Sequence, residues 1–183
     1  KTRSAKSLGT SGDAAATHAQ YARIGEALMD IGINMNFAPV LDIAQDPEST
    51  FVGSTGRIFG SDVDLVCQMG NAAVAGLADA NCLSVGKHFP GHGGSSEDSH
   101  AVTPVVDKSR ETLEQYDFVP FASAIDAGID AMLVAHILYP QVDDEIATMS
   151  EVIINGILRE EMGFDGLVVS DDFRMGGLTS RYS

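Results

Sequence analysis

The chain has 183 residues and a formal net charge of −15, with 44% hydrophobic and 20% charged residues. This length suffices for roughly one domain, and so large a negative charge disfavours nucleic acids and anionic membrane surfaces as partners. No run of about 18 apolar residues occurs, so the sequence predicts no membrane-spanning helix. The chain begins with Lys1 and shows no signal peptide. It resembles an internal segment, and its location in the cell stays open.

Hydrophobic spacing along the chain predicts helices and strands in strict alternation. The helices are expected over residues 13–31, 61–79, 109–127 and 150–162, and the strands over residues 33–41, 82–86, 131–135 and 166–170. Asp13 is expected to cap the first helix, and the spacing of Ser61 and Asp64 is that of a capping box for the second. Between them, residues 43–60 predict a polar loop.

The predicted strands are short, rich in valine and leucine, and lack alternation between polar and apolar residues. Such strands are buried on both faces, which is typical of a parallel sheet covered by helices. Two architectures have this order of elements: the (β/α)8 barrel and the doubly wound sheet, which usually carries a glycine-rich first turn. Because no such glycine pattern occurs, the sequence favours an α/β fold of the (β/α)8 TIM type.

Polar side chains follow each predicted strand at the point where the strand ends. They are Asp42, Lys87 with His88, His136, and Asp171 with Asp172. A (β/α)8 barrel builds its active site at the carboxyl ends of several strands at once. We therefore expect these side chains to gather at one edge of the sheet.

The most distinctive stretch is Lys87–His100, with the sequence KHFPGHGGSSEDSH. Its three glycines, three histidines and two acidic residues do not form a packed element, and Pro90 ends any strand that reaches Phe89. Loops held by a rigid scaffold carry much of protein chemistry. The stretch is therefore predicted to be a functional loop that brings titratable side chains to the strand ends.

A complete barrel needs about 200 to 250 residues, and four strand–helix units in 183 residues make about half of one. We therefore expect residues 1–183 to be part of a catalytic barrel domain whose other strands lie elsewhere. The inner faces of the strands would then lie open. The unpaired outer strands would pair with a complementary barrel segment or with a second copy of the chain.

Several segments together resemble the family 3 glycoside hydrolases, in the branch of the bacterial β-N-acetylglucosaminidases. They are KHFPGHG followed by DSH, NFAPVLD, GLVVSDD and MLVAH. The matches keep the family's order and extend from about Leu8 to Gly177. The resemblance implies a (β/α)8 barrel that needs no cofactor or metal ion. It also implies hydrolysis of terminal β-linked N-acetylglucosamine, with retention, in oligosaccharides derived from peptidoglycan or chitin. A β-glucosidase or β-xylosidase of the same family is the alternative.

The resemblance also implies roles for particular residues. They are Asp171 as the nucleophile, His100 as the acid–base residue with Asp98 as its partner, and Lys87, His88 and Arg57 as contacts to the sugar. A retaining glycosidase needs a carboxylate below the anomeric carbon and a proton donor beside the leaving oxygen. A histidine tuned by one carboxylate can supply that proton near neutral pH.

The chain departs from the family pattern in three places. The family has an upstream acidic segment, D-Q-E-G-G, whose Asp binds sugar hydroxyls, and this sequence has no counterpart. Two further strands of the family's barrel would follow Asp171, where only a short stretch remains. The loop that carries Arg57, GSTGRIFG, is slightly longer than the family's.

The residues alone also allow structural roles instead of catalytic ones. Asp171 would then cap the following helix, and His100 would be an exposed loop residue without a function. Lys87 would form an ion pair with Asp42. His136 would either line the site or be a hydrogen-bonded core residue.

Two other kinds of protein compete with the glycosidase interpretation. A metallohydrolase on the same barrel would draw its ligands from His88, His92, Asp98, His100 and His136. Against it, the H-x-x-x-H spacing spans a Pro-Gly pair and so does not lie on a helix face. A carbohydrate-binding or structural fragment without activity is the other alternative.

Overall fold

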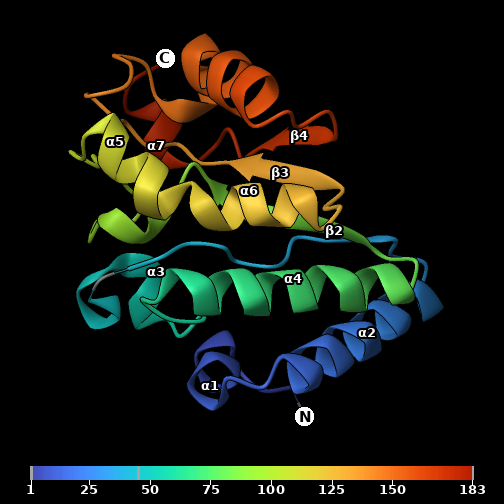
Figure 1. The fold of residues 1–183 in the computed structure, drawn as a ribbon. Helices are drawn as coiled ribbons and strands as arrows, with labels where there is room; N and C mark the ends of the chain where they lie inside the picture. The colour runs from blue at the N-terminus through green and yellow to red at the C-terminus, as the bar shows by residue number, and fades with distance from the viewer. Residues whose placement is uncertain (1, 45, 183) are drawn as a thin grey trace.

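The computed structural model describes residues 2–44 and 46–182. The elements in chain order are α1 (Ala5–Ser11), α2 (Ala14–Asp30), β1 (Met35–Asn36), η1 (Pro47–Ser49), α3 (Phe51–Ser54), α4 (Val63–Asp79), β2 (Leu83–Phe89), η2 (His92–Gly94), α5 (Arg110–Thr112), η3 (Leu113–Asp117), α6 (Val119–Asp126), β3 (Ala131–Val134), η4 (Ala147–Met149), η5 (Val152–Glu161), β4 (Leu167–Ser170) and α7 (Gly176–Thr179). Figure 1 shows the chain rising from α1 and α2 at the bottom to β4 and α7 at the top.

The strands of the described residues form one parallel, four-stranded sheet in the order β1-β2-β3-β4. In its register Asn36 lies opposite Ser84, Val85 opposite Ala131, and Met132 opposite Val168. Each strand therefore lies beside the strand that follows it in the sequence. This is the order of a barrel wall, whereas a doubly wound sheet reverses its direction at a switch point. The predicted α/β fold with a parallel, barrel-type sheet is confirmed.

The larger core lies between the sheet and the helices that cover its outer face. Phe89 of β2 packs edge-to-face against Phe121 of α6, with ring centroids 5.3 Å apart. Met132 of β3 and Ile157 of η5 belong to the same buried cluster. In Figure 1, α2 lies beside α4 below the sheet, and a second cluster that includes Tyr21 joins these two helices. The helices thus pack against the outer face of the sheet and do not cover the carboxyl ends of the strands.

The inner face of the sheet is less open than expected. Val85, Ala131 and Leu133 are at most 3% exposed, because they pack against one another and against Met35. Exposed apolar side chains remain at Leu167 of β4, which is 53% exposed, and at Leu83, where β2 begins, which is 40% exposed. Among the described residues, β1 and β4 each pair with one neighbouring strand.

The predicted strand over residues 33–41 is too long, since β1 contains two residues. Pro39 interrupts the ladder because proline has no N–H to donate. The chain nevertheless continues alongside β2, since the Leu41 N–H donates to the carbonyl of Lys87 at 2.7 Å. The predicted strand over residues 82–86 is too short, since β2 continues through Lys87 and His88 to Phe89.

A single side chain caps the start of each of the two long helices, α2 and α4. Asp13 caps α2, as predicted, by accepting from the Ala16 N–H at 2.9 Å. The cap of α4 is Asp62, which accepts from the Leu65 N–H at 2.8 Å, and not Ser61. The predicted loop over residues 43–60 contains two short helical turns, η1 and α3. Wider π-type turns in η3 interrupt the predicted helix over residues 109–127.

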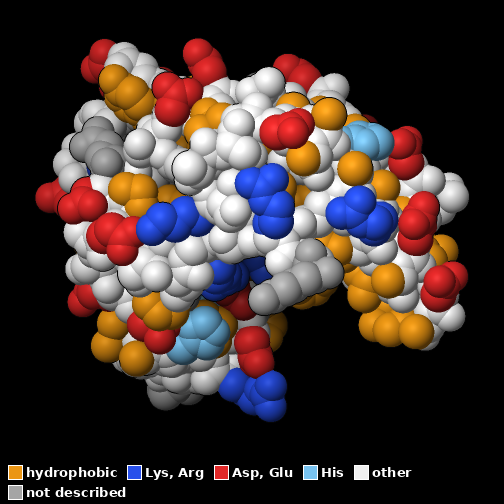
Figure 2. All heavy atoms as spheres, turned by 90° about the horizontal axis from the view of Figure 1, so that it is seen from below, with side chains coloured by type: hydrophobic (Ala, Val, Ile, Leu, Met, Phe, Trp, Pro, Cys, Tyr) orange, Lys and Arg blue, Asp and Glu red, His pale blue; other side chains and the backbone are white. Residues whose placement is uncertain are grey.

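The surface is rich in acidic side chains, as the net charge of −15 predicts. Acidic side chains are spread over the face in Figure 2, with hydrophobic side chains between them. Across the residues that the structure describes, every helix is too short or too polar to cross a membrane.

Candidate active site

The carboxyl ends of the strands surround a hollow of about 180 Å³. Its polar lining includes Arg57, Lys87, His88, His92, His100 and Asp171. Five of these were singled out in the sequence as site residues. They come from the loop after β1, from the end of β2, from the loop that follows β2, and from the residue after β4. The hollow thus collects residues that lie far apart in the chain.

A buried carboxylate below the hollow holds the end of β2. Asp42 is 0% exposed, and it accepts from His88 Nδ1 at 2.7 Å and from the His88 N–H at 3.2 Å. Burial acts to raise the pKa of Asp42, but His88 and His92 outweigh it and lower that pKa below its ordinary value. Because the carboxylate accepts from Nδ1, the other ring nitrogen of His88, Nε2, is left for a second partner.

Cationic groups line the same hollow. Arg57 Nη2 lies 3.5 Å from His88 Nε2, and Arg57 and Lys87 both border the hollow. Burial lowers the pKa of Lys87, and so does the neighbouring Arg57, while Asp171 and Asp42 act in the opposite direction. The alternative of an ion pair between Lys87 and Asp42 is wrong for the described residues, because Asp42 pairs with His88.

Asp171 sits where β4 ends, with its N–H bonded to the carbonyl of Val134 on β3 at 3.1 Å. Its side chain accepts from the Asp172 N–H at 2.9 Å. It does not cap the helix that follows, because α7 begins after Met175 and has no side-chain cap. The alternative of a capping role for Asp171 at that helix is therefore wrong.

His100 and Asp98 form a pair at the rim of the hollow. Asp98 Oδ1 accepts from His100 Nδ1 at 2.7 Å and from the His100 N–H at 2.9 Å. Desolvation acts to raise the pKa of Asp98, but these bonds from His100 outweigh it and lower that pKa. The side chain of His100 is 64% exposed, and its Nε2 is not used by Asp98. The pair can therefore present one ring nitrogen to a molecule in the hollow.

Besides the buried Asp42, two other polar residues at strand ends do not line the hollow. His136 is 0% exposed, and its ring lies 2.8 Å from Thr148 Oγ1 and 3.1 Å from the carbonyl of Asp172. The core alternative for His136 is therefore correct. The side chain of Asp172 bonds to Arg174, which lowers the pKa of Asp172 to about 2.

The structure also brings in residues that the sequence analysis missed. Phe51 of α3 borders the hollow, and its ring centroid lies 6.3 Å from that of His100. Ser99 is 4% exposed, and its Oγ lies 3.2 Å from His92 Nε2. A phenylalanine in a loop expected to be polar was the only sequence signal for Phe51, and Ser99 gave none beyond its place between Asp98 and His100.

The potential metal ligands do not converge. Within the described part of the chain, no three His, Cys, Asp or Glu side chains are placed to hold one metal ion. His136 is bonded away from the hollow, and Asp98 is turned to His100. The arrangement gives the metallohydrolase interpretation no support.

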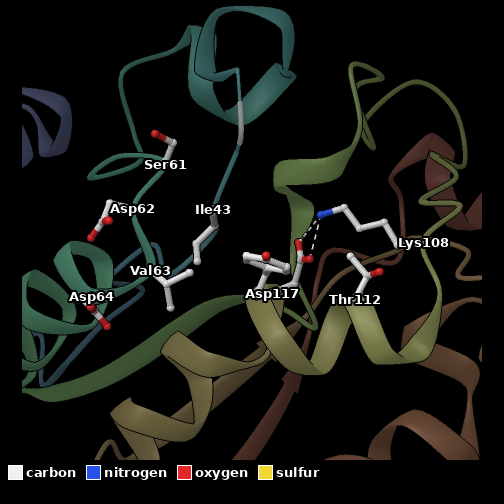
Figure 3. Close-up of a pocket in the computed structure, with 9 residues that line it drawn as sticks. Ile43, Ser61, Asp62, Val63, Asp64, Lys108, Thr112 and Asp117 are labelled. Carbon is white, nitrogen blue, oxygen red and sulfur yellow. Dashed lines mark hydrogen bonds and ion pairs between the residues drawn. The ribbon is translucent and has the colours of Figure 1, made fainter.

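A second hollow, of about 280 Å³, lies on the other side of the loop that follows β2. Figure 3 shows Lys108 extended toward Asp117, whose carboxylate accepts two hydrogen bonds from it at 2.7 and 2.8 Å. Asp62 and Asp64 line the same hollow but point away from this pair. The described residues that line it include no histidine, and its charged pair is already hydrogen-bonded, so the first hollow is the better candidate for chemistry.

Fold and site together define a segment of an α/β barrel that gathers a carboxylate, a histidine–aspartate pair and two cations at the strand ends. The chain belongs to glycosyl hydrolase family 3, because residues 4–183 match the N-terminal domain of that family.

Comparisons with individual proteins agree with this family assignment. A β-hexosaminidase of Thiobacillus denitrificans is 42% identical over 146 residues, which cover 80% of this chain and 40% of the relative. The structure of a family 3 β-N-acetylglucosaminidase from a Paenibacillus species superimposes with a TM-score of 0.91 at 42% identity, over 96% of this chain and 33% of the other. NagZ from Neisseria gonorrhoeae, solved with N-trifluoroacetyl-D-glucosamine, has a TM-score of 0.89 at 34% identity, over 97% of this chain and 52% of the other. The chain spans about 40% of the first curated relatives that it matches.

Proposed function

We propose that these residues form one side of the active site of a retaining β-N-acetylglucosaminidase. The observation that carries the proposal is the hollow in which Asp171, His100 and the cations meet. The names of the similar proteins support the sugar, since they include β-hexosaminidases and a β-N-acetylglucosaminidase. We further propose that the substrates are oligosaccharides from peptidoglycan or chitin that end in β-linked N-acetylglucosamine.

In the proposed first step, the carboxylate of Asp171 attacks the anomeric carbon and forms a covalent glycosyl–enzyme bond. The bond from this carbon to the leaving oxygen breaks, and His100 Nε2 gives its proton to that oxygen. In the second step His100 takes a proton from water, and the resulting hydroxide attacks the same carbon and releases Asp171. Two displacements on one carbon give net retention.

The partners of these two residues suit the proposed steps. Asp98 accepts from His100 Nδ1, which fixes the orientation of the ring and leaves Nε2 to carry the proton that is donated. Lys87 and Arg57 supply donors and His88 supplies a ring nitrogen along one wall of the hollow, and we propose that these three residues bind the sugar hydroxyls. Asp42 holds His88 by its Nδ1, so that Nε2 can face the sugar.

Specificity for the N-acetyl group is tested by comparing substrates. We expect the intact protein that contains these residues to cleave an aryl β-N-acetylglucosaminide with a kcat/KM at least about tenfold above those of the matching β-glucoside and β-xyloside, because one hydrogen-bonding group on a substrate can supply such a ratio. Proton NMR of the first product should show the β-anomer. Preference for the glucoside or xyloside would contradict the sugar assignment. No turnover of any of the three would favour the inactive-fragment alternative.

We also propose that the barrel wall is completed by a complementary segment or by a second copy of this chain. The open edges of β1 and β4, and the 53% exposure of Leu167 on β4, support this. An open apolar edge is a template for pairing. In size-exclusion chromatography with light scattering, the 183-residue chain should therefore elute as a dimer or larger species. Alone, it should show no turnover.

A substitution on the edge provides the matched control. Leu167→Lys puts a charge on the open strand and should shift the chain toward monomer, because lysine on an edge opposes strand pairing. A compact wild-type monomer that cleaves the substrate at ordinary rates would show that the chain needs no completing segment.

A further inference from the structure

The loop from Pro90 to Thr103 that carries Asp98 and His100, here called the dyad loop, is anchored at its start by Asp42. The carboxylate of Asp42 accepts from the His92 N–H at 2.7 Å, in addition to its two bonds from His88. Asp42 is 0% exposed and His92 is 2% exposed, so these bonds are shielded from water. One buried carboxylate thus fixes both His88, which lines the hollow, and the start of the dyad loop.

The side chain of His92 connects the start of the dyad loop to Ser99, near its other end. His92 Nε2 lies 3.2 Å from Ser99 Oγ, and the exposed fraction of Ser99 is 4%. The other ring nitrogen of His92 is buried without a hydrogen-bond partner among the described residues. Within that part of the chain, Ser99 is therefore the one hydrogen-bond partner that holds this ring.

The backbone of Ser99 is held from the opposite side by the segment after Asp171. The Gly177 N–H donates to the carbonyl of Ser99 at 2.8 Å, and the Gly176 N–H donates to the carbonyl of His100 at 2.9 Å. The approach requires glycine, because a Cβ on Gly176 would lie 2.3 Å from the carbonyl oxygen of Ala101. The two backbone segments that carry His100 and Asp171 are thus joined directly.

We propose that Ser99 is a positioning residue for the acid–base step, which links the Asp42–His92 anchor to the segment after Asp171. The inference rests on the proposed function. Asp98 and His100 flank Ser99, and their side chains are 37% and 64% exposed, so the packing around His100 in particular does little to fix it. Ser99 supplies the fixed point between them. Its displacement moves His100 relative to Asp171, and misplacement by about 1 Å can cost up to about a hundredfold in rate.

The first test is the leaving-group dependence of Ser99→Ala in the intact protein. We expect kcat to fall about tenfold for an alkyl β-N-acetylglucosaminide, which needs a proton donor, and less than about twofold for a nitrophenyl one. KM should change little for either substrate. The matched control is Ser95→Ala, because Ser95 is equally buried on the same loop and, among the described residues, its hydroxyl accepts only from the nearby Glu97 N–H. Equal losses on both substrates, or the same pattern in Ser95→Ala, would overturn the proposal.

A second test does not depend on turnover. Amide hydrogen exchange measured by NMR should become at least about fivefold faster at Gly176 and Gly177 in Ser99→Ala, because their acceptors are then less fixed, while the core strands stay protected. Unchanged exchange at these two amides would refute the positioning role, whether or not the wild type hydrolyses any substrate. Wild type without turnover but with the expected exchange would contradict the proposed function alone.

A pair of variants at His92 covers the case in which Ser99→Ala does not fold. The side chain of His92→Gln can place an amide near the position of Nε2, and that of His92→Asn is too short to reach it. We therefore expect His92→Gln to keep most of the activity on the alkyl substrate, and His92→Asn to show the loss predicted for Ser99→Ala. Equal activity of the two variants would mean that the bond to Ser99 does not matter.

Discussion

Asp171→Ala should reduce turnover of an aryl β-N-acetylglucosaminide by more than about a thousandfold in the intact protein. The side chain follows β4, lines the hollow and belongs to a backbone that is held by Val134 of β3. Loss of a covalent nucleophile removes the first displacement itself, and such losses normally cost several powers of ten. The measurement is kcat with the nitrophenyl substrate, with circular dichroism to show that the variant is folded.

The neighbouring carboxylate gives a matched control for the nucleophile. Asp172→Ala removes a side chain that bonds to the exposed Arg174 outside the hollow. We expect it to keep at least about a third of the wild-type kcat, since surface substitutions are usually close to neutral. Retention of more than about a tenth of kcat in Asp171→Ala, or equal losses in the two variants, would sink the assignment of Asp171.

His100→Ala should lower kcat by about 10²- to 10⁴-fold for substrates with poor leaving groups and much less for activated ones. An activated leaving group departs without a proton, so the loss reports the acid step itself. Asp98→Asn should show a milder version of the same pattern, because the carboxylate that accepts from His100 Nδ1 is lost while the ring stays. The measurement is kcat over a series of aryl leaving groups of different pKa.

A histidine remote from the hollow serves as the control in this series. His18 lies on α2, and its ring pairs with Asp79 at 3.0 Å, so His18→Ala should leave the dependence on the leaving group unchanged. If His100→Ala lost the same factor on every substrate, His100 would position the sugar and would not transfer a proton.

Local patterns in the sequence predicted most of the helices and strands and several of the residues that border the hollow. Asp13 precedes an apolar helical pattern and caps α2. Three parallel strands lie where short runs rich in valine and leucine predicted them. Lys87 and Asp171 border the hollow because they come at or after the end of such runs, and the ends of parallel strands meet at one edge.

Local patterns failed where a contact from elsewhere in the chain competes with them. Pro39 shortens β1, yet the segment still bonds to β2 through Leu41, which strand propensity does not show. The sequence predicted Ser61 as the cap of α4, and the structure has Asp62. Serine and aspartate are both good capping residues, so local sequence did not decide between them. Phe51 reaches His100 through the packing of a loop against another loop, and no periodicity encodes such a contact.

The sequence by itself determined the parallel order of the chain and the kinds of side chain at its strand ends. Only the tertiary structure decided which of those side chains face the hollow. Asp42 lies buried beneath it, because His88 and His92 supply its hydrogen bonds, and His136 turns into the core toward Thr148. A buried charged or polar group must find partners. Those partners come from segments that are distant in the chain, so orientation depends on packing that no single stretch of sequence contains.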